Sequence, residues 1–168
     1  ERPKTLISAS AIGYYGDRGD ELLYEDADPG DDFLAGVVVG WEAAARSAED
    51  HGLRVVTIRS GHVLDPRGGL LKELMLPFKL GVGGPIAGGK QYMSWIHRHD
   101  EVGILLWALG NDAVAGPVNA TAPNPVTNKE FSKALGKELG RPSILPLPGF
   151  AIDIVKGGGV GHAAREGQ

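Results

Sequence analysis

Three sets of residues in this chain have types and spacings that could support chemistry. The first is the glycine-rich run at residues 13–19, which follows an apolar stretch and has the spacing of a phosphate-binding loop. Such a loop leads directly into a helix whose N–H groups bind the phosphates. Here Asp20 and Glu21 follow, and more acidic residues continue to Asp32, which would repel a diphosphate. We expect a turn after a strand; the alternative is a true phosphate loop.

The second set consists of histidines and a carboxylate, which are common metal ligands. His97, His99 and Asp100 lie close together in the sequence. Two histidines spaced in this way at a strand end, with one carboxylate, are poor evidence for a metal site, so we predict none. His62 could titrate near neutral pH, although an isolated histidine more often serves packing or hydrogen bonding.

The third set holds hydroxyl groups near the end of the first apolar run. Ser8, Ser10, Tyr14 and Tyr15 follow one another within eight positions. Serine and tyrosine hydroxyls can donate or relay protons. The alternative is that small residues at a strand end only permit close packing.

The elements that must position these residues alternate between strand and helix. Apolar and β-branched runs predict buried strands at residues 5–9 and 53–58. Between them we expect a loop over residues 11–32 and a helix over 33–51, capped by Asp32 and ended by Gly52. This succession predicts two parallel strands joined by a right-handed crossover.

Further elements follow toward the C-terminus. Thr127 and Glu130 form a capping box that predicts the start of a helix, and Gly140 marks its end. The expected helices cover residues 70–80 (with Pro77 as a kink or boundary), 100–109, 127–139 and 150–155, and the expected strands cover 91–96, 117–120 and 143–147.

Six motifs, each weak alone, occur in one order along the chain. They are Ser-Ala-Ile-Gly-Tyr-Tyr-Gly, Asp-Phe-Leu-Ala, Trp-Glu-Ala-Ala, Arg-Ser-Gly-His-Val-Leu, Leu-Pro-Phe-Lys-Leu-Gly-Val-Gly-Gly-Pro and Trp-Ile-His-Arg-His-Asp. Together they closely resemble the atypical short-chain dehydrogenases/reductases of the NAD-dependent epimerase/dehydratase family, in the group of predicted nucleoside-diphosphate sugar epimerases.

The resemblance implies an α/β fold: the C-terminal half of a Rossmann-type parallel sheet plus a smaller, mixed α/β substrate lobe. Residues 1–66 and about 97–120 would belong to the NAD(P)-binding domain, and about 67–96 and 121–168 to the substrate lobe. Members of this group also carry an N-terminal glycine-rich turn, which is absent here. The cofactor site would therefore be incomplete in this chain.

The resemblance also assigns site residues. In related enzymes a helix carries Tyr and Lys four positions apart, but counting back from Trp41-Glu42 places Leu34 and Val38 there. The active-site serine falls at Ala11, or at Ser10 after a one-residue shift. The cofactor wall would comprise Ser8, Ala9, Ser10, Arg59, Ser60, Gly61 and His62. Catalytic candidates are Ser10, Tyr14, Tyr15, His62 and His97, and Asp100 would cap the following helix.

The functional expectation is an NAD(P)-dependent epimerase/dehydratase-like oxidoreductase that acts on a nucleotide sugar or a related small molecule, with NADP favoured over NAD. The alternative is a non-catalytic dinucleotide-binding sensor or regulator, because some similar proteins carry a cell-division label. Net charge of -4, no basic block and no apolar run of about 20 residues disfavour nucleic-acid and membrane partners. The absence of cysteine is compatible with a cytoplasmic location. A homodimer is also expected.

Overall fold

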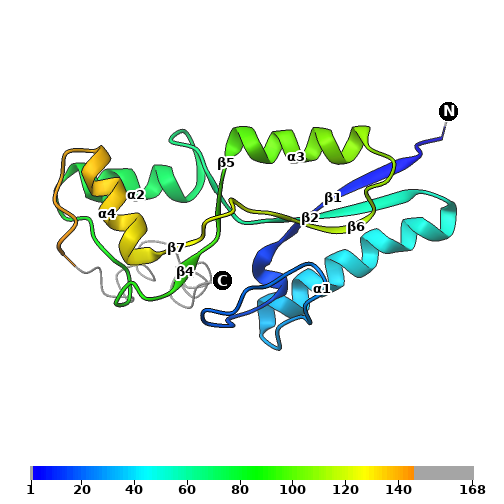
Figure 1. Ribbon diagram of the computed structural model, residues 1–168, viewed down its shortest axis with the longest axis horizontal. Helices are drawn as coiled ribbons and strands as arrows, with labels where there is room; N and C mark the ends of the chain where they lie inside the picture. The colour runs from blue at the N-terminus through cyan, green and yellow to red at the C-terminus, as the bar shows by residue number, and fades with distance from the viewer. Residues whose placement is uncertain (1, 146–168) are drawn as a thin grey trace. The chain divides into compact units, whose positions relative to one another are not determined.

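The computed structural model describes residues 2–145 and divides into two compact units (Figure 1). One unit comprises Glu1–Val63 and Ile96–Ala122, and the other comprises Leu64–Trp95 and Pro123–Gln168. The cofactor and substrate roles that the sequence assigns to two domains stay a prediction.

The first unit is built on three parallel strands in the order β1-β2-β6. They are β1 (Thr5–Ala11), β2 (Arg54–Ser60) and β6 (Gly116–Ala120). Helix α1 (Phe33–Arg46) lies on one face of this sheet and α3 (Arg98–Gly110) on the other (Figure 1). The predicted parallel strands around a helix are therefore confirmed.

Helix α1 begins where its sequence predicts. The Asp32 carboxylate accepts a hydrogen bond from the Ala35 N–H at 2.8 Å, so this residue is the N-cap. The α-helix ends at Arg46, earlier than expected, and continues as the 3₁₀ helix η2 (Ser47–His51). Gly52 then adopts a left-handed conformation, with φ of 78°, which ends the helical segment.

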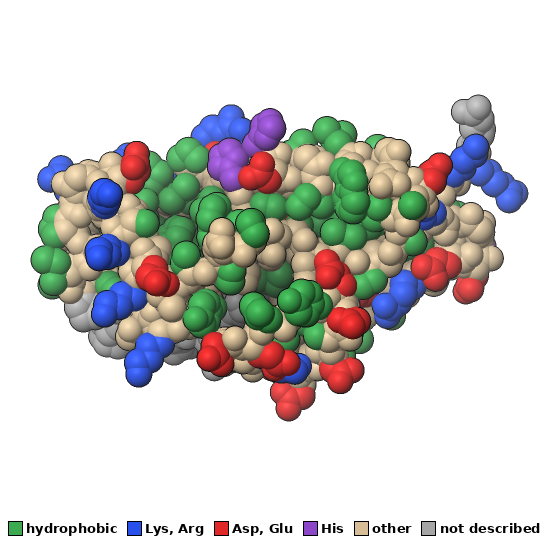
Figure 2. Space-filling model, in the orientation of Figure 1, with side chains coloured by type: hydrophobic (Ala, Val, Ile, Leu, Met, Phe, Trp, Pro, Cys, Tyr) green, Lys and Arg blue, Asp and Glu red, His purple; other side chains and the backbone are tan. Residues whose placement is uncertain are grey.

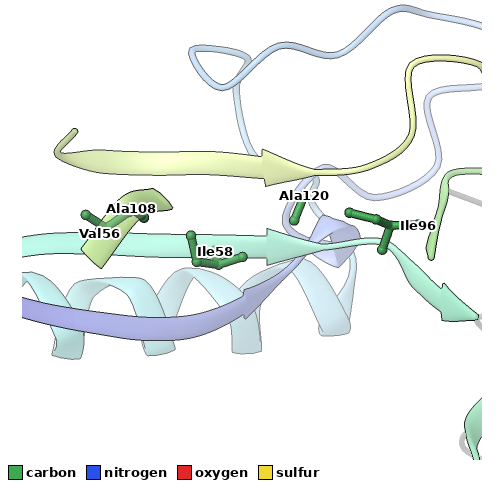
Figure 3. Close-up of a cluster of buried hydrophobic side chains, with 5 residues drawn as sticks. All are labelled: Val56, Ile58, Ile96, Ala108 and Ala120. Atoms are coloured by element: carbon green, nitrogen blue, oxygen red, sulfur yellow. The ribbon is translucent and has the colours of Figure 1, made fainter. Parts of the chain in front are cut away.

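An apolar core lies on the α3 side of the sheet. Val56 and Ile58 lie two positions apart on β2 and therefore point to the same face. They pack with Ile96, Ala108 and Ala120, and all five residues are at most 2% exposed (Figure 3). Side chains from β2, from β6, from α3 and from the strand β5 (Trp95–His97) that precedes it thus close this face.

The start of α3 differs from the expectation. Its N-cap is His97, whose Nδ1 accepts a hydrogen bond from the His99 N–H at 3.2 Å, and Asp100 lies within the first turn. The cap predicted at Asp100 is wrong because the helix begins directly after strand β5 (Trp95–His97). The single strand expected at residues 91–96 is also wrong, since β4 (Tyr92–Met93) and β5 are separate strands.

The second unit combines helices with a short antiparallel pair of strands. The predicted capping box is present: Thr127 caps α4 (Asn128–Glu138) and bonds reciprocally with Glu130. The other elements are α2 (Gly69–Lys79), which contains Pro77, and β7 (Val126–Thr127), which pairs with β4. Strand β3 (His62–Leu64) pairs with β5 where the chain leaves and re-enters the first unit.

The end of the described chain differs from the sequence prediction. Residues 143–145 are not a strand, and the described residues offer them no partner strand. The rest of that predicted strand and the predicted helix at 150–155 lie outside the described residues. Within the described part, the helices are too short or too polar to span a bilayer.

Candidate functional site at the carboxyl ends of the strands

Three polar side chains form one row across the sheet, close to the carboxyl end of each strand. Ser10 of β1 is paired with Arg59 of β2, and Arg59 is paired with Asn119 of β6. Paired residues in adjacent strands point to the same face. That face is the one covered by α1, because the Ser10 hydroxyl donates a 2.7 Å hydrogen bond to Glu42 of that helix.

The centre of the row is a buried ion pair between Arg59 and Glu42, each 1% exposed. Arg59 Nε and Nη2 donate to the two carboxylate oxygens at 2.8 and 2.9 Å. Burial opposes ionisation of both groups, but their mutual bonds outweigh it. The pKa of Glu42 therefore lies below its ordinary value, and the pKa of Arg59 lies above its own.

The two tyrosines after β1 contact Arg59 in different ways. The Tyr15 hydroxyl donates to Asn119 Oδ1 at 2.6 Å and accepts from Arg59 Nη1 at 2.9 Å. Burial raises the pKa of Tyr15, although Arg59 partly opposes the shift. Tyr14 instead places its ring 3.5 Å from the Arg59 guanidinium carbon. Its hydroxyl has no hydrogen-bond partner among the described residues.

The same network holds the acidic loop that follows β1. Arg59 donates to the Glu25 carbonyl at 3.0 Å, and the Asn119 N–H donates to the Glu25 carboxylate at 2.9 Å. The Asn119 side-chain amide donates to the Leu23 carbonyl at 3.3 Å. Residues 15–32 contain no helix, so the N–H groups that a phosphate loop requires are not arranged there. This agrees with the expected turn.

The next residue of β2 points to the opposite face. The Ser60 hydroxyl donates a 2.5 Å hydrogen bond to one carboxylate oxygen of Glu101, on α3. The other oxygen, Oε2, is buried and has no hydrogen-bond partner in the described part of the chain. The structure therefore brings together Ser10 and Arg59 of the predicted wall and sends Ser60 to the other side of the sheet.

The other predicted wall residues make fewer contacts. The Ser8 hydroxyl donates to the Ala9 carbonyl at 3.3 Å, and Ala9 itself is exposed. The Gly61 N–H donates to the Ala120 carbonyl at 3.0 Å. Burial lowers the pKa of His62. Its imidazole is therefore neutral at pH 7.

The histidines at the start of α3 lie on the surface. His97 is exposed, and the His99 ring nitrogen lies 3.9 Å from the Asp100 carboxylate. Among the described residues, no three His, Asp or Glu side chains form a group that could hold a metal ion.

Helix α1 carries Leu34, Val38 and Glu42 on one face, at spacings of four residues. Val38 is buried and Leu34 is half-buried. Since α1 connects two parallel strands, it runs antiparallel to them. Val38 and Leu34 therefore lie one and two turns beyond Glu42, in the direction of the carboxyl ends.

Comparisons with known proteins agree with this geometry, although no family model matches the chain. An epimerase family protein of Mycobacterium bovis is 47% identical over 148 residues, which cover 88% of this chain and 49% of that protein. The crystal structure of human epimerase family protein SDR39U1 (isoform 2) with NADPH is 41% identical, with a TM-score of 0.91, over 99% of this chain and 56% of that one. The chain belongs to the epimerase family of atypical short-chain dehydrogenases/reductases.

A bacterial member of known structure extends this relationship. The nucleoside-diphosphate sugar epimerase of Corynebacterium glutamicum is 40% identical, with a TM-score of 0.74, over 98% of this chain and 38% of that one. The chain thus has the α/β fold of NAD(P)-dependent epimerases. It spans about half the length of the curated epimerase family proteins that it matches.

Sequence reasoning assigned no role to Glu42, Asn119 or Glu101. A signal for Glu42 was present: it is the only charged residue between Asp32 and Arg46, in an otherwise apolar helix. Arg59 likewise follows four apolar or hydroxyl residues of β2. Buried charges are nearly always paired, so each predicts the other. Nothing in the sequence indicates Asn119, because its partners are about 60 to 100 residues away.

Proposed function

We propose that this chain forms the nicotinamide end of the cofactor site, and a substrate lobe, of an NADP-binding, epimerase-like oxidoreductase. One observation carries the proposal: the row of Ser10, Arg59 and Asn119 fixes the carboxyl ends of three parallel strands. Ligands of open α/β sheets bind at these ends. The NADPH in the crystal structure of the human relative supports the same assignment and favours NADP over NAD.

The network suggests two different roles for the proposed wall residues. Ser10 and Arg59 direct their polar atoms at Glu42, so they hold the strand ends in place rather than contact the cofactor with their side chains. Contact with the cofactor would then fall to Ser8, Ala9 and the backbone from Ser60 to His62. The substrate would be a nucleotide sugar or a related small carbonyl or hydroxyl compound.

The proton donor in this proposal is Tyr14. Leu34 and Val38 occupy the helix positions where related enzymes carry Tyr and Lys, and aliphatic groups cannot transfer protons. The hydroxyls of Ser10 and Tyr15 both donate inside the buried network. Burial lowers the pKa of the half-buried His62 imidazole, and the imidazole of His97 caps α3. Tyr14 is half-buried, and its hydroxyl is free of described partners, so it can reach a ligand.

A second candidate function is a dinucleotide sensor without catalysis. The aliphatic residues at 34 and 38, together with the engaged hydroxyls of Ser10 and Tyr15, favour it. A cytoplasmic location and a homodimer are compatible with both functions, and we keep both as proposals.

The test uses the complete gene product that carries this chain. NADPH binding is measured by calorimetry, and turnover is measured with a panel of nucleotide sugars and carbonyl compounds. We expect binding, and we expect Tyr14→Phe to abolish turnover while the dissociation constant for NADPH stays unchanged. Tyr24→Phe, at a tyrosine that is 65% exposed and lies outside the proposed substrate lobe, is the control. Binding without turnover favours the sensor, and absence of binding contradicts both candidates.

A further inference from the structure

Helix α4 carries three lysines along its exposed side. Lys129, Lys133 and Lys137 follow one another at intervals of four residues, so they lie on one face of the helix. The other face is buried and includes Phe131 and Gly136. Figure 2 shows basic side chains along the helix that Figure 1 labels α4. We call these three residues the lysine stripe, and it extends over about 12 Å at the rise of an α-helix.

The lysine stripe is unfavourable for its own helix. Like charges four residues apart on a helix repel each other. Lys129 lies in the first turn, where a cation also opposes the positive end of the helix dipole. None of the three lysines forms an ion pair with a described residue, and the nearby Glu130 carboxylate bonds to Thr127 instead. A bound anionic group would relieve this repulsion.

The first unit carries a surface of the opposite charge. Residues 17–32 contain eight Asp and Glu residues and one basic residue, Arg18. Figure 2 shows acidic side chains gathered where Figure 1 draws this loop and the start of α1. Four of its carboxylates are exposed and form no ion pair with a described residue. We call them the acidic patch, which consists of Asp20, Asp26, Asp28 and Asp31.

The loop that carries the acidic patch is held in place. Arg59 donates to the Glu25 carbonyl at 3.0 Å, and the Asn119 N–H donates to the Glu25 carboxylate at 2.9 Å. Farther along, the Gly30 N–H donates to the Tyr14 carbonyl at 2.9 Å. Because the loop is already ordered, a partner that binds its carboxylates pays little conformational entropy on this side of the contact.

The separation of charge extends to the two units as wholes. The first unit has fifteen Asp and Glu residues and seven Lys and Arg residues, whereas the second has six and ten. Surfaces of opposite charge attract and orient molecules that meet in solution. In the described part of one chain, no ion pair joins the lysine stripe to the acidic patch.

We propose that the lysine stripe of one copy of the protein binds the acidic patch of a second copy. In a twofold dimer the contact is made twice, because the stripe of each copy then meets the patch of the other. A long polyanion such as RNA fits less well, since the excess negative charge of the first unit repels it. The inference goes beyond the proposed function: it assigns surfaces to self-association and requires no cofactor.

The test uses the complete gene product that carries this chain, without cofactor. Light scattering measures its mass over a range of protein concentrations in NaCl at about 0.01 M and about 1 M, where the Debye length is about 30 Å and about 3 Å. We expect a salt-sensitive association step whose dissociation constant rises about tenfold or more between the two conditions. Assembly that persists at high salt is the baseline, and absence of a salt-sensitive step overturns the proposal.

Two charge-reversed variants identify the surfaces. The stripe variant has Lys129→Glu, Lys133→Glu and Lys137→Glu, and the patch variant has Asp26→Lys, Asp28→Lys and Asp31→Lys. Each variant alone should lose the salt-sensitive step, because its stripe and patch carry charges of the same sign. When the two are mixed in equal amounts, association should return, since each stripe then meets a patch of opposite sign.

A matched control reverses three exposed lysines outside the stripe, and it has Lys4→Glu, Lys72→Glu and Lys79→Glu. Its net charge equals that of the stripe variant, and it should keep the salt-sensitive step. Loss of the step in this control would show that net charge alone governs association. That result would overturn the proposal, as would a mixture that fails to associate although both variants unfold at the temperature of the parent. Tighter binding of the stripe to a single-stranded RNA oligonucleotide than to a second copy would also overturn it.

Discussion

At the carboxyl end of β2, the two faces of the sheet have different chemical surroundings. Each nitrogen of Arg59 has a hydrogen-bond acceptor. Ser60, the next residue, bonds to a carboxylate whose second oxygen has no partner among the described residues. Strand alternation alone separates them. The face toward α1 is held by buried polar groups, and the face toward α3 is held by apolar packing.

The two faces differ in how their stability depends on each member. A buried ion pair adds little net stability, but removal of one partner leaves the other charge buried and unpaired in a medium of low polarity. When a side chain in an apolar cluster is shortened, the fold loses the transfer free energy of the deleted atoms and is further destabilised by the cavity that remains. The polar face should therefore be sensitive to charge and pH, and the apolar face to volume.

The largest effect should come from Glu42→Ala. The substitution leaves the buried Arg59 without its counter-ion and the Ser10 hydroxyl without its acceptor. We expect a loss of about 3 to 5 kcal/mol in the free energy of unfolding, measured by urea denaturation. Glu49→Ala, at an exposed position of η2, should change it by less than about 0.5 kcal/mol. If both substitutions lowered the free energy of unfolding equally, the hydrogen-bonded network of Ser10, Glu42 and Arg59 would not stabilise the fold as one unit.

A somewhat smaller loss should follow from Ile58→Ala on the other face. Ile58 is 1% exposed and packs in the cluster with Ala108 and Ala120. We expect about 3 kcal/mol less stability, because a cavity replaces the side chain. The loss should be the same at pH 5 and pH 8, since no titrating group is removed. A loss that changes with pH would contradict the division between the faces.

The sequence was sufficient for the elements whose signals are local. Asp32 is a hydrogen-bond acceptor directly before an apolar helical run, and this position predicts that it caps the helix. Thr127 and Glu130, three residues apart before another helical run, predict the capping box in the same way. The parallel strands follow from apolar runs on either side of a helix.

The site depended on information that is not local. Both faces of β2 are buried, so its apolar pattern does not reveal which face Arg59 or Ser60 points to. The row of Ser10, Arg59 and Asn119 requires the register of three strands, and its first and last residues are 109 positions apart in the sequence. The cap predicted at Asp100 is wrong because the N-cap lies three residues earlier, at His97, whose imidazole accepts from the His99 N–H.

The pH dependence of stability should single out the polar face. The pKa of Glu42 is lower in the folded chain than its ordinary value of 4.5. Its contribution to stability is therefore fully present above pH 4.5 and is lost as the pH falls through the folded pKa. We expect Glu42→Gln to be less stable than the parent at pH 7, and this difference to shrink as the pH falls below 4.5. A constant difference would exclude Glu42 as the titrating group.

The smallest effect should come from Glu101→Gln, which matches Glu42→Gln in chemistry but lies on the other face. The glutamine carbonyl can still accept from Ser60, and the substitution removes a charge whose second oxygen has no described partner. We expect a change within about 0.5 kcal/mol, in either direction, by urea denaturation at pH 7. A loss as large as that of Glu42→Gln would mean that the free oxygen is bonded in solution. The two faces would then differ in which groups bond to each other, and not in how strongly their stability depends on charge.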